Sequence, residues 1–250
     1  MELQTKVPLS DLNFQIDYRD QILLLGSCFS DHMGALFAKH QFKTLSNPFG
    51  IVFHPIPLAS LVQRMVFKHY FTEDAFFFYE AQWHSYELHS SMSRTVLSDA
   101  LRNANEVIDL GHDFLKKASH VFVTLGTAWG YMLNHTTVTN CHKQRSDLFR
   151  KELASVSAIE NALAQIQNTL AQINPDLKVV YTVSPVRHLK DGFTGTFTPP
   201  TKEVLKEVVS IQNGLDHRPS NPTAEAHKKL LHTLGVRMAK IKRQYPHMFP

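Results

Sequence analysis

The amino-acid sequence predicts an α/β protein built around a mainly parallel sheet. Three short apolar runs, at residues 21–25, 120–125 and 178–183, each end at a Gly-Ser, Gly-Thr or Ser-Pro turn. Runs of this length that stop at a turn are typical of buried strands. Amphipathic stretches of helical length separate the runs. Strands that alternate with such helices indicate βαβ units, so we expect one parallel sheet covered by helices.

The helices follow from the same local signals. Apolar residues recur every three or four positions from Leu153 to Ile173, which predicts one buried helix face that Asn174-Pro175 ends. The aromatic stretch at residues 75–83 breaks this rhythm and favours an inserted strand or hairpin. Further helices are expected at residues 30–40 and 95–117, with two more beyond residue 201.

The composition is that of an ordinary globular protein. Of 250 residues, 43% are hydrophobic and 19% are charged, which excludes the disordered, collagen-like and coiled-coil classes. We expect residues 1–200 to form one domain and residues 201–250 a basic helical extension packed on it. The extension carries nine Lys and Arg against four Asp and Glu. Because these charges are interspersed with apolar residues, we do not expect a nucleic-acid partner.

Membrane, disulfide and metal classes are not expected either. No apolar run reaches the ~18 to 20 residues of a spanning helix, and the first 20 residues lack a signal-peptide core, so we expect a cytoplasmic protein. Two cysteines, Cys28 and Cys141, are too few for a disulfide framework or a structural zinc site. We expect no metal and no cofactor. The sequence leaves the oligomeric state open.

The first candidate for chemistry is a serine that directly follows the first apolar run. In open parallel sheets, ligands bind at the carboxyl ends of the strands. The pair Gly26-Ser27 places a hydroxyl at such an end and near a helix N-terminus, where amide groups can stabilise an oxyanion. The alternative is that Ser27 only caps the helix, since serine is a favoured N-cap. Cys28 is expected to pack rather than to attack a substrate.

Several motifs in order along the chain resemble one family. Gly-Ser-Cys-Phe-Ser at residues 26–30 resembles the signature of the GSCFA family, with serine in place of the final alanine. Similar stretches of that family occur at residues 47–55, 83–85, 89–90, 125–129, 140–143, 184–188, 217–219 and 221–222. The family is similar to SGNH (GDSL-like) hydrolases. That resemblance implies a three-layer α/β/α, flavodoxin-like fold with C-terminal helices, and ester chemistry on a small-molecule or acylated substrate.

The resemblance also implies roles for individual residues. Ser27 would be the nucleophile, and its own N–H and that of Gly50 would bind the oxyanion. Gly50 could equally be only a turn residue. Gly126 and Thr127 follow the second run, where the wider superfamily often places an asparagine as a third donor. Asn140 is a possible substitute for that asparagine.

The general base is the open question of this sequence. SGNH enzymes take it from an Asp-x-x-His motif after the last strand, but the junction at residues 193–200 is too short for the ~30 residues of a further βα unit. The only Asp-x-x-His, at residues 109–112, is expected at the amino edge of the sheet as a surface feature.

His188 is the best substitute for the missing base, because it follows the third run and therefore lies on the same edge as Ser27. Arg187 beside it could bind a substrate carboxylate or phosphate, or form a salt bridge. His54, His84 and His89 could also line the pocket or be structural. Two hypotheses remain: a serine esterase or acyl hydrolase, and a catalytically degenerate SGNH fold that binds a ligand or partner.

Overall fold

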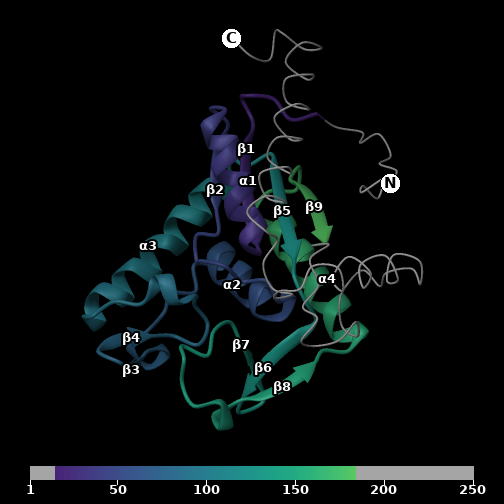
Figure 1. The fold of residues 1–250 in the computed structure, drawn as a ribbon. Helices are drawn as coiled ribbons and strands as arrows, with labels where there is room; N and C mark the ends of the chain where they lie inside the picture. The colour runs from purple at the N-terminus through teal and green to yellow at the C-terminus, as the bar shows by residue number, and fades with distance from the viewer. Residues whose placement is uncertain (1–14, 184–250) are drawn as a thin grey trace, which may run out of the picture.

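The computed structural model describes residues 15–183, and its centre is a parallel sheet of four strands. The strands lie in the order β2-β1-β5-β9 (Figure 1). All three pairings between neighbours are parallel, which confirms the predicted α/β class. Their bounds are Gln21–Gly26 for β1, Lys43–Ser46 for β2, His120–Leu125 for β5 and Lys178–Val183 for β9.

Within residues 15–183, four helices cover both faces of this sheet and form its outer layers (Figure 1). Alternate residues of β1 face opposite layers: Leu24 lies under Gly34 of α1, whereas Leu23 and Leu25 join the main hydrophobic core. That core also contains apolar residues of α2, α3 and α4, so these three helices pack on the face opposite to α1. The helices are α1 at Cys28–Lys39, α2 at Pro55–Phe67, α3 at Leu97–Leu115 and α4 at Val156–Ile173.

Two small antiparallel sheets are inserted into the parallel pattern. The predicted hairpin at residues 75–83 is confirmed as β3 (Phe77–Tyr79) and β4 (Gln82–His84). The second sheet, in the order β7-β6-β8, was not expected from the sequence. It lies beyond the carboxyl ends of β5 and β9 (Figure 1), and its strands are β6 at Trp129–Leu133, β7 at Thr136–Val138 and β8 at Arg150–Leu153.

The predicted strands and helices agree with the structure to within a few residues. The exception is Leu153, which was assigned to a helix face and instead ends β8. The remaining regular elements within residues 15–183 are short 3-10 helices at Glu73–Ala75, Ser90–Met92 and Ser146–Leu148. The predicted C-terminal helices lie outside the described residues. Within residues 15–183, no helix is long and apolar enough to cross a membrane.

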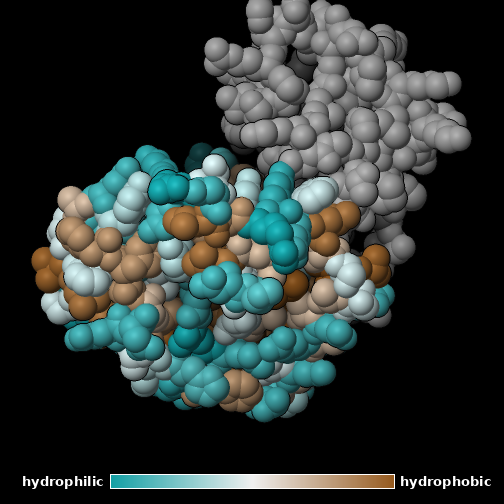
Figure 2. All heavy atoms as spheres, turned by 90° about the horizontal axis from the view of Figure 1, so that it is seen from below, coloured by the Kyte–Doolittle hydropathy of each residue, from teal (hydrophilic) through white to brown (hydrophobic). Residues whose placement is uncertain are grey.

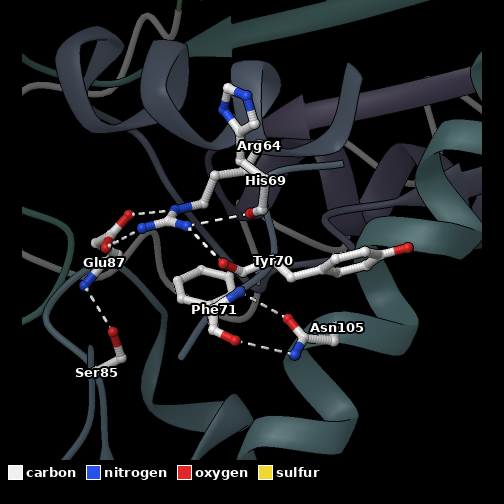
Figure 3. Close-up of polar contacts among 7 residues, drawn as sticks. All are labelled: Arg64, His69, Tyr70, Phe71, Ser85, Glu87 and Asn105. Carbon is white, nitrogen blue, oxygen red and sulfur yellow. Dashed lines mark hydrogen bonds and ion pairs between the residues drawn. The ribbon is translucent and has the colours of Figure 1, made fainter. Parts of the chain in front are cut away.

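A polar network holds two loops against the C-terminal end of α2 (Figure 3). The guanidinium of Arg64 donates to both carboxylate oxygens of Glu87, each at 2.7 Å, and to the backbone carbonyl oxygen of His69 at 3.1 Å. Asn105 of α3 binds both the N–H and the C=O of Phe71, at 2.8 and 3.1 Å. Glu87 belongs to the loop after β4, so this network fixes the position of that loop.

The Asp-x-x-His motif at residues 109–112 forms part of the same helix junction. Asp109 accepts hydrogen bonds from Lys68 and Tyr70, each at 2.7 Å. These contacts hold the pKa of the Asp109 carboxyl below its usual value. His112 Nδ1 lies 3.0 Å from the carbonyl oxygen of Val66, near the end of α2. The pair therefore joins α3 to α2, which is consistent with the non-catalytic role expected from the sequence.

Candidate functional site

The turn between β1 and α1 places Ser27 at the carboxyl edge of the sheet. Gly26 has φ +119°, and a Cβ atom there would lie 2.1 Å from the carbonyl oxygen of Thr124. Only glycine fits this close approach between β1 and β5. The next residue, Ser27, is the N-cap of α1, and its Oγ accepts a hydrogen bond from Phe29 N at 3.3 Å. The predicted capping role is thus present, in the same side chain that is the candidate nucleophile.

Asn47 clamps this turn from the end of β2. Its Oδ1 accepts from Gly26 N at 2.8 Å, and its Nδ2 donates to Ser27 O at 3.3 Å and to Asp31 Oδ1 at 2.7 Å. Asn47 is buried and has φ +38°, a left-handed conformation that asparagine tolerates better than most residues. One side chain therefore fixes the backbone on both sides of the Gly26–Ser27 peptide bond.

The loop after Asn47 runs across the carboxyl ends of β1 and β5. Val52 N donates to Gly26 O at 3.0 Å, and Gly126 N donates to Phe53 O at 3.1 Å. The loop is therefore bonded to both strands. The absence of a side chain at Gly126 allows the loop to lie this close to β5, because a Cβ atom there would lie only 3.0 Å from Phe53 Cβ.

The backbone donors expected for an oxyanion are already engaged. Ser27 N donates to Thr124 O at 3.0 Å, and Gly50 N donates to Asn47 O at 2.7 Å. Neither group is free in this structure, and their expected role as oxyanion donors stays a prediction. Cys28 N, the first amide of α1, has no partner among the described residues. It is the donor adjacent to Ser27 that remains available.

Gly50 is a turn residue, which is the alternative that the sequence left open. Its φ is +79°, and a Cβ atom would lie 2.4 Å from Cβ of His89. Phe49 O also accepts a hydrogen bond from His89 N at 3.3 Å. The glycine lets His89 pack directly on the loop that clamps the Ser27 turn.

His54 and His84 are structural histidines, since both ring nitrogens of each have partners. His54 caps α2 by accepting from Ile56 N at 3.3 Å, and its Nε2 lies 3.2 Å from Ala128 O. Burial lowers the pKa of His54, which favours the neutral ring in this arrangement. His84 contacts Ser93 Oγ at 2.7 Å and Tyr79 O at 3.0 Å.

His89 differs from these two because one ring nitrogen is unengaged. Its Nδ1 accepts from Ser91 N at 3.2 Å, so the neutral ring carries its proton on Nε2. That Nε2 has no partner within residues 15–183. Burial lowers the pKa of His89, while the charge of Asp31 acts in the opposite direction. His89 is therefore the described motif histidine that presents a free donor near the Ser27 turn.

The other predicted polar residues stabilise local turns. Thr127 Oγ1 accepts from Trp129 N at 3.1 Å, and Asn140 Oδ1 accepts from His142 N at 2.8 Å. His142 is buried, and its Nε2 lies 2.8 Å from Ser85 O. Burial lowers its pKa to about 4, and its Nδ1 has no partner in the described part of the chain.

Two predicted residues, Arg187 and His188, lie outside the described residues. Within residues 15–183, Ser27 Oγ makes no hydrogen bond to an imidazole. No cluster of three or more His, Cys, Asp or Glu side chains in that range could hold a metal ion.

The fold and the Gly-Ser turn define the class: an α/β protein with a hydroxyl at the carboxyl edge of its parallel sheet. The model of the GSCFA family matches residues 21–210, and that of the GSCFA domain protein, C-terminal domain, matches residues 208–249. The chain therefore belongs to the GSCFA family, as its motifs predicted. Neither a curated protein nor a solved structure matches the chain.

Proposed function

We propose that the protein is a serine hydrolase of the SGNH type that cleaves an ester or acyl substrate, with Ser27 as the nucleophile. The observation that carries the proposal is the position of Ser27, on a glycine turn between a buried parallel strand and a helix N-terminus. Family membership supports it through the resemblance of GSCFA sequences to SGNH hydrolases.

In this reaction, Ser27 Oγ attacks the carbonyl carbon while its proton passes to a base. The tetrahedral intermediate collapses to an acyl-serine, and the alcohol leaves with that proton. Water then adds to the acyl-serine and releases the acid, which restores the serine hydroxyl. The proposed base is His188, with Arg187 beside it to bind an anionic part of the substrate.

The negative charge on the carbonyl oxygen is stabilised by the positive end of α1. Since Ser27 N and Gly50 N are engaged, we assign the backbone donation to Cys28 N. His89 Nε2–H is a second donor on the neighbouring loop. Gly126, Thr127, Asn140 and His84 support the site by fixing the surrounding backbone.

The test separates the nucleophile from the helix cap. Ser27→Gly removes the hydroxyl but costs only a few tenths of a kcal/mol as a cap, whereas Ser27→Ala costs about 1 kcal/mol. Both variants should lose fluorophosphonate labelling and turnover of 4-nitrophenyl esters. Ser98→Ala is the matched control, because Ser98 is an exposed serine in the first turn of another helix. Unchanged turnover in Ser27→Gly would contradict the proposal.

A second candidate function is ligand or partner binding without chemistry. The observation that favours it is that no described imidazole contacts Ser27 Oγ. Under this alternative, fluorophosphonate would not label the folded protein, and Ser27→Gly would leave ligand binding unchanged.

A further inference from the structure

One face of the central sheet is covered unevenly by the helices of residues 15–183. Helices α2, α3 and α4 pack on the opposite face, and α1 lies chiefly against β2 and β1. Strand β9 is two strands beyond β1 in the sheet order, which is about 10 Å away at the usual spacing of neighbouring strands. On the α1 side, β9 therefore lacks a covering helix from this part of the chain.

Apolar side chains project from this part of the sheet. Leu24, which lies under α1, is in register with Phe122 of β5, and Phe122 is in register with Val180 of β9. Phe122 and Val180 are outside the main core and keep part of their surface exposed, whereas Val179 packs against that core. We call the surface of Phe122, Val180 and Thr182 the β5–β9 face. Parallel sheets are normally covered on both sides, so this face calls for a partner.

The sequence beyond residue 220 contains an apolar stripe of matching length. Apolar residues recur there at intervals of three and four, at Leu231, Leu234, Met238 and Ile241. On a helix they would share one face. The stripe would be about 15 Å long, against about 20 Å for the six-residue strands β5 and β9. An Asn-Pro pair at residues 221–222 is a typical start signal for such a helix.

Charge and chain length agree with packing on the same molecule. Lys229, Lys240 and Arg243 would lie on the side of the helix opposite to the stripe. Residues 201–250 carry a net charge of +5, whereas residues 1–200 carry −1. Strand β9 ends at Val183, and the chain from there to residue 221 can extend over about 100 Å, so its length allows a return along the sheet. The model of the GSCFA C-terminal domain matches residues 208–249, which contain the whole stripe.

The far end of the described domain is less suited to an apolar stripe. Figure 2 views the molecule from the end where β6 to β8 lie in Figure 1. Hydrophobic residues on that surface are separated by hydrophilic ones. A continuous apolar stripe would cover polar groups there, whereas Phe122 and Val180 offer it apolar contacts on adjacent strands.

We propose that residues 221–245 form a helix that packs its apolar stripe on the β5–β9 face and completes the layer that α1 begins. The segment itself lies outside the described residues. Its basic residues then form the outer surface of this layer, which gives the basic extension a structural role. The inference does not depend on the proposed hydrolase function.

Disulfide trapping in the full chain tests this packing. The background is Cys28→Ser with Cys141→Ser, which removes both cysteines of the sequence. In it, Val180→Cys is combined in turn with Leu231→Cys, Leu234→Cys, Met238→Cys and Ile241→Cys. Under mild oxidation, at least one pair should form an intramolecular disulfide in most molecules, because packed side chains bring the Cα atoms to within about 7 Å. Mass spectrometry of the remaining free thiols measures the yield.

Two matched controls define the faces of the sheet and of the helix. Val179→Cys is the control on the sheet, because Val179 is the adjacent valine and faces the core. Lys240→Cys is the control on the segment, because Lys240 is next to Ile241 but outside the stripe. Neither Val179→Cys with the four stripe variants nor Val180→Cys with Lys240→Cys should form the disulfide above background.

The alternatives give different products. Absence of a disulfide in all four Val180 pairs, or equal yields in the control pairs, would overturn the proposal. A disulfide that forms only between two chains would assign the β5–β9 face to a second copy and would also overturn it. Hydrogen exchange of the unaltered chain is an independent measurement: amides of residues 231–241 should exchange at least roughly a hundredfold more slowly than in a free peptide. Unprotected amides there would overturn the proposal even if a cysteine variant failed to fold.

Discussion

Replacement of Asn47 tests whether its side chain holds the Ser27 turn. The hydrogen bonds to Gly26 N and Ser27 O are each worth about 1 kcal/mol, and the bond to the Asp31 carboxylate about 2 kcal/mol. Their loss in Asn47→Gly is therefore expected to lower the free energy of unfolding by about 3–4 kcal/mol. Asn47→Ala should cost roughly 1 kcal/mol more, because alanine is strained at φ +38°.

The measurement is urea unfolding followed by circular dichroism, with the slope of the transition as a check on two-state behaviour. Asn134 is the matched control. It also has positive φ, but it is an exposed residue of the turn between β6 and β7, and its side chain makes no hydrogen bond within residues 15–183. Asn134→Gly should be nearly neutral. If Asn47→Gly lowers the free energy of unfolding by less than about 1 kcal/mol, the Asn47 side chain does not hold the Ser27 turn as described.

Three further predictions concern the loops around the site. Gly50→Ala should destabilise the protein by more than 2 kcal/mol in urea unfolding, since its Cβ would lie 2.4 Å from that of His89; normal stability would contradict the packing described. A double-mutant cycle of Arg64→Ala and Glu87→Ala should give a coupling energy of about 1 kcal/mol for this partly buried pair, and additive effects would contradict the two hydrogen bonds between the side chains. The folded-state pKa of His142, about 4, lies below the unfolded value near 6.5. Unfolding free energy should therefore fall as pH drops from about 6.5 to 4, by up to about 3 kcal/mol, and His142→Gln should reduce this loss; an unchanged pH profile in the variant would refute the assignment.

The sequence predicted the central strands because they are short, apolar and bounded by turns. Strand β2 was missed because Lys43–Ser46 is short and not fully buried, so it shows no apolar run. Helix α2 was missed because its first turn contains Pro55 and Pro57, although proline is tolerated at that position. Strands β6 to β8 are only three to five residues long, so the β-branched residues of Thr136–Val138 did not by themselves indicate a sheet.

The site was predictable in position but not in its hydrogen bonds. Gly26-Ser27 could be located because it directly follows an apolar run. The engagement of Ser27 N could not, because its acceptor, Thr124 O, lies on another strand. Likewise, His54 and His84 resemble catalytic candidates in sequence, and only tertiary contacts with Ala128 and Tyr79 show that they are structural.

The loop over the sheet edge also bears on the motions open to this protein. Gly26 donates to Asn47 and accepts from Val52, so the serine turn is bonded to both ends of one short loop. Neither segment can open alone without breaking these bonds. The amide protons of Gly26 and Val52 should therefore exchange with solvent as one cooperative unit. The Ser27 turn and this loop are then expected to open together rather than one after the other.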